Sequence, residues 1–179
     1  MTQKSILYWM SFLGLLSLSS FSRASTPEQL APPTPHHAHA LVVAESGSKI
    51  SGNVDFTEEP DGMEVHYKLT GLEPNTRHGF HVHEKGKCDD DGKAAGKHFV
   101  KLSGSGTSSD FPSHYAGDLP EIVSDSFGNS EGTVFVSRLS MNKANPIADR
   151  SVVIHGGEDD VSSKSTPRIA CGVIRRAPD

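Results

Sequence analysis

Four histidines of the sequence have the spacing of a metal site. His81 and His83 are separated by one residue, His98 follows AAGK, and His155 ends the apolar segment SVVI. Residues i and i+2 of a β-strand lie on one face, so His81 and His83 would project together. Sets of three or four imidazoles suit copper or zinc, and a tetragonal all-imidazole site favours copper. The spacing therefore predicts a metal site, the alternative being histidines that are only exposed or hydrogen-bonded.

The segments around these histidines alternate between apolar and polar residues with a period of two. Residues 50–56 and 63–69 show the pattern clearly and are separated by the turn sequence EEPDG. Further strand candidates are residues 78–83, 133–139, 151–155 and 168–174. No stretch after the N-terminal region has helical periodicity over ten residues. We therefore predict an all-β fold, an antiparallel sandwich or barrel, with one long irregular insertion from Cys88 to about Pro120.

The N-terminal region has the composition of an export signal. Lys4 precedes a mostly apolar stretch over residues 6–18, and Ser22-Arg23-Ala24 offers small residues at the two positions that a signal peptidase reads. The apolar stretch is short for a membrane span, and a buried N-terminal helix is the alternative. We predict a secretory signal at residues 1–24, a flexible Pro-rich leader at residues 25–40, and one β domain at residues 41–179.

The predicted leader ends in three closely spaced histidines, His36, His37 and His39. They could share a metal ion loosely, and a solvated polar tail is the alternative. Removing residues 1–24, which hold two of the 17 basic residues and no acidic one, leaves 15 basic against 22 acidic residues. This net charge of −7 argues against nucleic acid and anionic lipid as partners. The two cysteines, Cys88 and Cys171, favour one disulfide over free thiols in an exported chain.

Five ordered motifs resemble those of the copper/zinc superoxide dismutase family. They are GFHVHEKGKC, AAGKHF, AGDLP, SVVIHGGEDD and RIACGVI. The resemblance covers the chain from about His39 to Ile174. It indicates an exported bacterial member of the family. It implies a flattened Greek-key β-barrel, with superoxide as the substrate and a monomer or homodimer as the assembly.

The resemblance also implies roles for individual residues. The four histidines would bind copper, and Cys88 and Cys171 would form the disulfide. Arg168 matches the arginine that draws the anion toward the metal, and a guanidinium stays charged at any working pH. Dismutation needs a metal that cycles by one electron, which copper does and zinc does not. His98, the imidazole that would bridge the two metals, is the candidate for carrying a proton, so His98 and Arg168 are the predicted catalytic residues.

The sequence departs from the family at the zinc site. The family completes this site with the bridging histidine, two further histidines and an aspartate, but the two positions of the extra histidines read Gly106 and Tyr115. At most His98, His114 and Asp118 remain, and structural zinc takes four protein ligands. We therefore expect a weak or absent zinc site, with Asp118 as a residual ligand or as a turn residue.

The segment between His155 and Arg168 is a second departure, because it looks shorter than the family's anion-guiding loop. Copper-only members of the family share both departures. Asp159 matches a carboxylate that links zinc and copper ligands through hydrogen bonds, and an exposed turn aspartate is the alternative. We predict a periplasmic or secreted copper-dependent superoxide dismutase. The alternative is a copper-binding or copper-delivery protein, but such a protein has no need of Arg168.

Overall fold

The computed structural model describes residues 36–100, 115–141, 146–159 and 166–178. Within these residues the regular structure is β-strand, apart from one 3-10 turn at Lys93–Ala95 (η1). The predicted all-β class is therefore confirmed. No helix among the described residues has the length and apolar character that crossing a bilayer requires.

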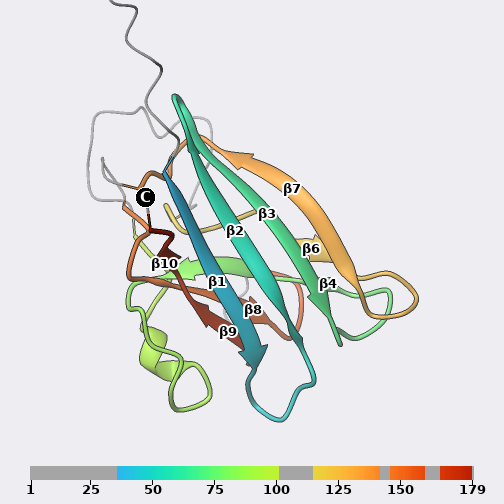
Figure 1. Ribbon diagram of the computed structural model, residues 1–179. Helices are drawn as coiled ribbons and strands as arrows, with labels where there is room; N and C mark the ends of the chain where they lie inside the picture. The colour runs from blue at the N-terminus through green and yellow to red at the C-terminus, as the bar shows by residue number, and fades with distance from the viewer. Residues whose placement is uncertain (1–35, 101–114, 142–145, 160–165, 179) are drawn as a thin grey trace, which may run out of the picture. The chain divides into compact units, whose positions relative to one another are not determined.

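Ten strands account for the sheets of the described residues. Seven of them follow one antiparallel path in the order β5-β8-β9-β1-β2-β3-β7, β10 pairs with β1, and β4 pairs with β6 separately. Figure 1 shows β1, β2, β3 and β7 side by side. Pairing of β3 with β7 and of β5 with β8 joins segments distant in the chain, as in Greek-key folds. The bounds are β1 His37–Ala44, β2 Ser51–Glu59, β3 Gly62–Thr70, β4 Arg77–His78, β5 Phe80–His83, β6 Ile122–Val123, β7 Ser130–Val136, β8 Ser151–His155, β9 Arg168–Val173 and β10 Arg175–Arg176.

The β2–β3 hairpin follows from the alternation of its residues. Val54 and Phe56 on β2 and Val65 on β3 are fully buried, and Phe56 lies directly opposite Val65. The polar residues between them face outward, and the chain turns at Pro60 and Asp61, as the sequence predicts. This inward set joins one core with apolar residues of β5 and β8, so the strands that carry the histidines are packed on their inner side.

The first strand begins at His37, four residues before the predicted start of the β domain. The predicted boundary at residue 40 is therefore wrong. Ala38 and Ala40 are buried in the core while His37 and His39 face outward. This is the alternation of a β-strand, with small alanine side chains at the inward positions. Alanine has weak strand propensity, so this alternation was hidden in the sequence. Residues 1–35, including the predicted secretory signal, lie outside the described residues.

The predicted strand over residues 78–83 is two strands in the structure. His78 ends β4, which pairs with β6, and Phe80 begins β5, which pairs with β8. Gly79 lies between them, where an added Cβ would collide with the carboxylate of Asp159. A side chain at this position would therefore push Asp159 away from its place beside β5.

Both described ends of the long insertion dock on β5. The Phe99 N–H donates to the Val82 carbonyl at 2.9 Å, and the Val82 N–H donates to the Gly117 carbonyl at 2.7 Å. A Cβ on Gly117 would collide with the Val82 carbonyl oxygen, so glycine permits this close approach. The docking places His98 opposite His83 and Asp118 opposite His81. Residues 101–114 of the insertion lie outside the described residues.

Candidate metal centre

The structure brings the four predicted copper ligands to one point. His81 and His83 come from β5, His155 from the end of β8, and His98 from the docked insertion. Each offers a ring nitrogen, and these four atoms all lie within 4.8 Å of one another. The residues on β5 and β8 are at most 5% exposed, whereas the His98 side chain is 30% exposed. The centre therefore has a buried floor, and His98 is its most exposed member.

Backbone carbonyls fix which nitrogen two of the rings present. His83 Nδ1 donates to the Gly96 carbonyl at 3.1 Å, and His155 Nδ1 donates to the Thr166 carbonyl at 3.2 Å. A carbonyl only accepts, so both Nδ1 atoms carry the proton and both Nε2 atoms of the neutral rings carry a lone pair. The two Nε2 atoms lie 3.4 Å apart. Two buried lone pairs at this separation repel each other, and a cation between the rings removes the repulsion.

Burial also keeps these two rings neutral. It lowers the pKa of His83 to about 2 and the pKa of His155 to about 4. The charges of Arg168 and of the neighbouring histidines lower both pKa values further. A metal ligand must be the neutral imidazole, so no proton has to be displaced near neutral pH.

His81 is oriented in the opposite way. Its Nε2 lies 2.8 Å from Asp159 Oδ2, and its Nδ1 is buried without a hydrogen-bond partner among the described residues. An unpartnered buried nitrogen is costly in a protein interior and is the atom that a metal ion would take. The Asp159 N–H in turn donates to Glu121 Oε1 at 2.7 Å. Asp159 is therefore more than an exposed turn residue, because it selects the ligand atom of His81.

Asp118 contacts the ring that would bridge two metals in the family. His98 Nδ1 lies 3.1 Å from Asp118 Oδ1, and Asp118 Oδ2 accepts the Tyr115 N–H at 2.9 Å. Burial acts to raise the pKa of Asp118, but the hydrogen bonds from His98 and Tyr115 outweigh it and lower the pKa. The carboxylate is thus ionised, and it leaves Nε2 of His98 to the centre. The Tyr115 ring packs edge-on against His98, with centroids 5.8 Å apart.

Of the three predicted zinc ligands, the structure brings His98 and Asp118 together. His114 lies outside the described residues, as does Gly106. The sequence did not indicate Arg138, whose guanidinium donates to the carbonyls of Ala116 and Asp118 and so fixes the turn beside the centre. The signal available in the sequence was an arginine near the end of the predicted strand over residues 133–139.

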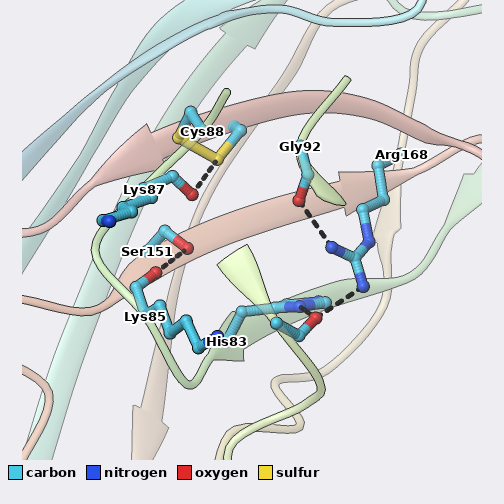
Figure 2. Close-up of a disulfide and its surroundings, with 9 residues drawn as sticks. His83, Lys85, Lys87, Cys88, Gly92, Ser151 and Arg168 are labelled. Carbon is cyan, nitrogen blue, oxygen red and sulfur yellow. Dashed lines mark hydrogen bonds between the residues drawn. A yellow bond between two sulfur atoms is a disulfide. The ribbon is translucent and has the colours of Figure 1, made fainter. Parts of the chain in front are cut away.

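Arg168 lies beside the centre and shares an acceptor with His83. Its Nη1 donates to the Gly92 carbonyl at 2.5 Å and its Nη2 donates to the Gly96 carbonyl at 2.6 Å. The Gly96 oxygen is the atom that also accepts from His83 Nδ1. Figure 2 shows the Arg168 side chain reaching from β9 toward Gly92 and toward the segment beside His83. Two of the five N–H groups of the guanidinium are thus used to fix its position.

Cys88 and Cys171 form a disulfide with a Cα–Cα distance of 5.7 Å, which confirms the predicted pair. It links the start of the insertion to β9, the strand that begins with Arg168 (Figure 2). The predicted anion-guiding segment lies between His155 and Arg168, and its residues 160–165 are outside the described residues.

Comparison with known proteins agrees with this geometry. The family model for copper/zinc superoxide dismutase matches residues 50–174. The chain belongs to the copper/zinc superoxide dismutase family. A superoxide dismutase [Cu-Zn] of Yarrowia lipolytica is 37% identical over 150 residues, covering 75% of this chain and 96% of that protein. The corresponding proteins of Humicola lutea and Cordyceps militaris are 35% and 32% identical with the same coverage.

Membership of the family and the four-histidine centre together support superoxide dismutase activity and copper as the cofactor. The family match covers the four histidines, both cysteines, Arg168, Asp118 and Asp159, because all lie within residues 50–174.

Proposed function

We propose that the chain is an exported superoxide dismutase that works with copper and holds zinc weakly or not at all. The observation that carries this proposal is the ligand set, in which Tyr115 and Gly106 stand where the family has two further zinc histidines, and His98 and Asp118 are the predicted zinc ligands that the structure brings together. In a site with two metals, the second nitrogen of a bridging imidazole would face the zinc ion. Here that nitrogen, Nδ1, lies against the Asp118 carboxylate at 3.1 Å. The carboxylate can thus orient His98 without a second metal ion.

Different residues of the centre would bind copper and attract the substrate. Copper supplies one-electron redox chemistry when it is bound, converting superoxide to dioxygen and hydrogen peroxide. Nδ1 of His81 and Nε2 of His83, His98 and His155 are the nitrogens that would hold it. Arg168 provides a fixed positive charge beside these rings for the superoxide anion. His98, as the most exposed ring, is the group that can take a proton from solvent at Nε2 when this nitrogen is not bound to copper, and pass it to the reduced anion.

The remaining ligands for zinc are few. Among the family's zinc positions, Tyr115 replaces one histidine and Gly106 another. A tyrosine ring packed edge-on against His98 occupies space beside the bridging ring. Since a tight structural zinc site takes four protein ligands, this chain is expected to lose zinc more readily than copper.

The periplasm or the cell exterior is the compartment that fits the chain best. The disulfide between Cys88 and Cys171 is stable in oxidising compartments and uncommon in the cytosol. The N-terminal sequence, with its apolar stretch at residues 6–18 and a small-residue site ending at Ala24, supports the same proposal.

Metal analysis combined with kinetics tests the function. The protein purified from its native compartment should hold one copper ion and substantially less than one zinc ion per chain after treatment with a chelator. Its rate of superoxide removal per copper should exceed that of free copper. A full zinc equivalent that survives the chelator but is lost in Asp118→Ala would overturn the copper-only part. A rate no higher than that of free copper would instead favour a copper-delivery protein.

A further inference from the structure

A second group of metal-binding side chains lies on the outer face of β1, β2 and β3. The register places His39 of β1 directly opposite Asp55 of β2, and Asp55 directly opposite His66 of β3. Directly opposite residues of an antiparallel pair share one face, with Cβ atoms about 4.5–5.5 Å apart. The three side chains therefore form a row across three adjacent strands, and none of them belongs to the four-histidine centre.

The burial pattern shows that this row faces solvent. The residues that alternate with it, Ala38, Val54 and Val65, are at most 2% exposed and belong to the core. His39 is exposed, and the side chains of His66 and Asp55 are 43% and 49% exposed. An ion in solution can thus reach the row directly.

Two more potential ligands flank the row. His37 precedes His39 by two residues on β1, and Glu64 precedes His66 by two residues on β3, so both lie on the same outer face. In the structure His37 Nδ1 is 3.1 Å from Thr57 Oγ1, the residue opposite it on β2. His37 shares the outer face of β1 with His39 and is the candidate for an additional ligand.

Side-chain rotations must gather the ligand atoms of the row before they can hold an ion. His66 Nδ1 lies 3.9 Å from Asp55 Oδ2, and the same oxygen accepts from Asn53 Nδ2 at 2.5 Å. The four-histidine centre is the one described group whose ligand atoms are already gathered. Because His39, Asp55 and His66 are all partly exposed, their rotamers can change without disturbing the core.

Nearby cations do not prevent binding. Arg175 of β10 is opposite His39 on the other side of β1, but its guanidinium pairs with Asp149 at 3.1 Å. Lys68, two residues after His66, pairs with Glu131 at 2.9 Å. Each of these positive charges is thus balanced by its own carboxylate, which leaves the charge of Asp55 available to an ion.

We propose that His39, Asp55 and His66 bind one divalent transition-metal ion of the copper and zinc type on the outside of the sheet, with His37 as a further ligand. Two imidazoles and a carboxylate are a ligand set that Zn(II) and Cu(II) accept. The ligands come from rigid strands, but rotamers must be ordered when the ion binds. This site therefore holds its ion more weakly than the buried centre does and exchanges it with solvent.

Titration of the full chain, with copper already in the four-histidine centre, tests the proposal. Zn(II) alone and Cu(II) alone are added in separate experiments, and binding is followed by calorimetry and by equilibrium dialysis. One further ion per chain should bind with at least one of the two metals. Each of three variants should weaken this binding by about ten-fold or more: His39→Ala, Asp55→Asn and His66→Ala. Two remaining ligands cannot hold the ion in the coordination geometry that three ligands provide.

Two control variants distinguish this site from metal binding elsewhere on the chain. Glu59→Gln removes an exposed acid from the end of β2, on the same outer face as Asp55, and should leave the binding unchanged. Asp118→Ala should also leave it unchanged, since Asp118 belongs to the predicted zinc position. The proposal is overturned if no further ion binds, if the three variants bind it as tightly as the unmodified chain, or if only Asp118→Ala abolishes it. Thermal unfolding of each variant checks that the sheet is intact.

Discussion

His98 and Asp118 are joined by a hydrogen bond between Nδ1 and Oδ1 at 3.1 Å, which assigns the other ring nitrogen of His98 to the metal centre. The bond depends on the docking of both ends of the insertion on β5, because this docking brings residues 98 and 118 together. Asp118 therefore lies on the side of the His98 ring that faces away from the metal centre.

Asp118→Ala tests this relationship. The variant should lower copper affinity by about ten-fold or more, since groups that orient a ligand imidazole have effects of this size. Asp118→Asn keeps an oxygen acceptor for His98 Nδ1 and should recover much of the affinity. The measurement is copper affinity by competition with a chelator of known strength. Equal affinity in Asp118→Ala and the unmodified chain would show that the bond does not orient His98.

His83→Ala should abolish both stoichiometric copper binding at the centre and dismutation. The remaining ring on β5, His81, cannot fix the ion alone, and His83 contributes the Nε2 atom that faces His155 at 3.4 Å. Metal analysis and the rate of superoxide removal are measured together, and circular dichroism checks the fold. Activity equal to that of the unmodified chain at equal copper loading would contradict the assignment.

Arg168→Ala should cut the second-order rate of dismutation by roughly ten-fold or more and flatten its dependence on ionic strength. Electrostatic steering of superoxide is a known property of this family, and its assignment to Arg168 is the part that belongs to this chain. Copper affinity should change much less, because His83 keeps its own bond to the Gly96 carbonyl.

Arg168→Lys is the matched variant, and it should recover part of the rate because it keeps the charge while losing the planar donor group. Stopped-flow kinetics over a series of salt concentrations provide the measurement. If the rate constant of Arg168→Ala matched that of the unmodified chain at every salt concentration, Arg168 would have no role in attracting the anion.

Removal of the disulfide by Cys88→Ser with Cys171→Ser should lower the free energy of unfolding by about 3–5 kcal/mol, because the bond closes a long loop in the unfolded chain. The two cysteines are 83 residues apart. The variant should also lose activity per bound copper, since the bond links the insertion to the strand that carries Arg168. Denaturant unfolding measures the first effect, and two titratable thiols in the native protein would contradict the bond itself.

Local patterns in the sequence were sufficient for much of the fold. The alternation of residues 50–56 and 63–69 predicted β2 and β3, and the apolar segment before His155 predicted β8 with its observed ends. These predictions succeed because a strand with one buried face must repeat every two residues. β1 was not among the predicted strands, because two of its inward positions, Ala38 and Ala40, are too small to mark a buried face.

The four histidines of the metal centre could also be predicted from the sequence. His81 and His83 have the spacing of one strand face, and the family motifs add His98 and His155. The spacing does not reveal which nitrogen of each ring is available. That choice depends on acceptors far away in the chain, such as Asp159 for His81 and the Thr166 carbonyl for His155.

Tertiary structure alone decided how the distant segments meet. The sequence contains Asp118, Arg138 and Arg168 as separate charged residues. Docking of the insertion on β5, and the pairing of β9 with β8 that sets Arg168 opposite His155, bring them around the histidines. The row of His39, Asp55 and His66 has the same origin, because strand register joins residues that no local pattern relates. Periodicity fixes which face a side chain takes within its own strand, whereas its neighbours across strands and loops are fixed by hydrogen-bond register and core packing.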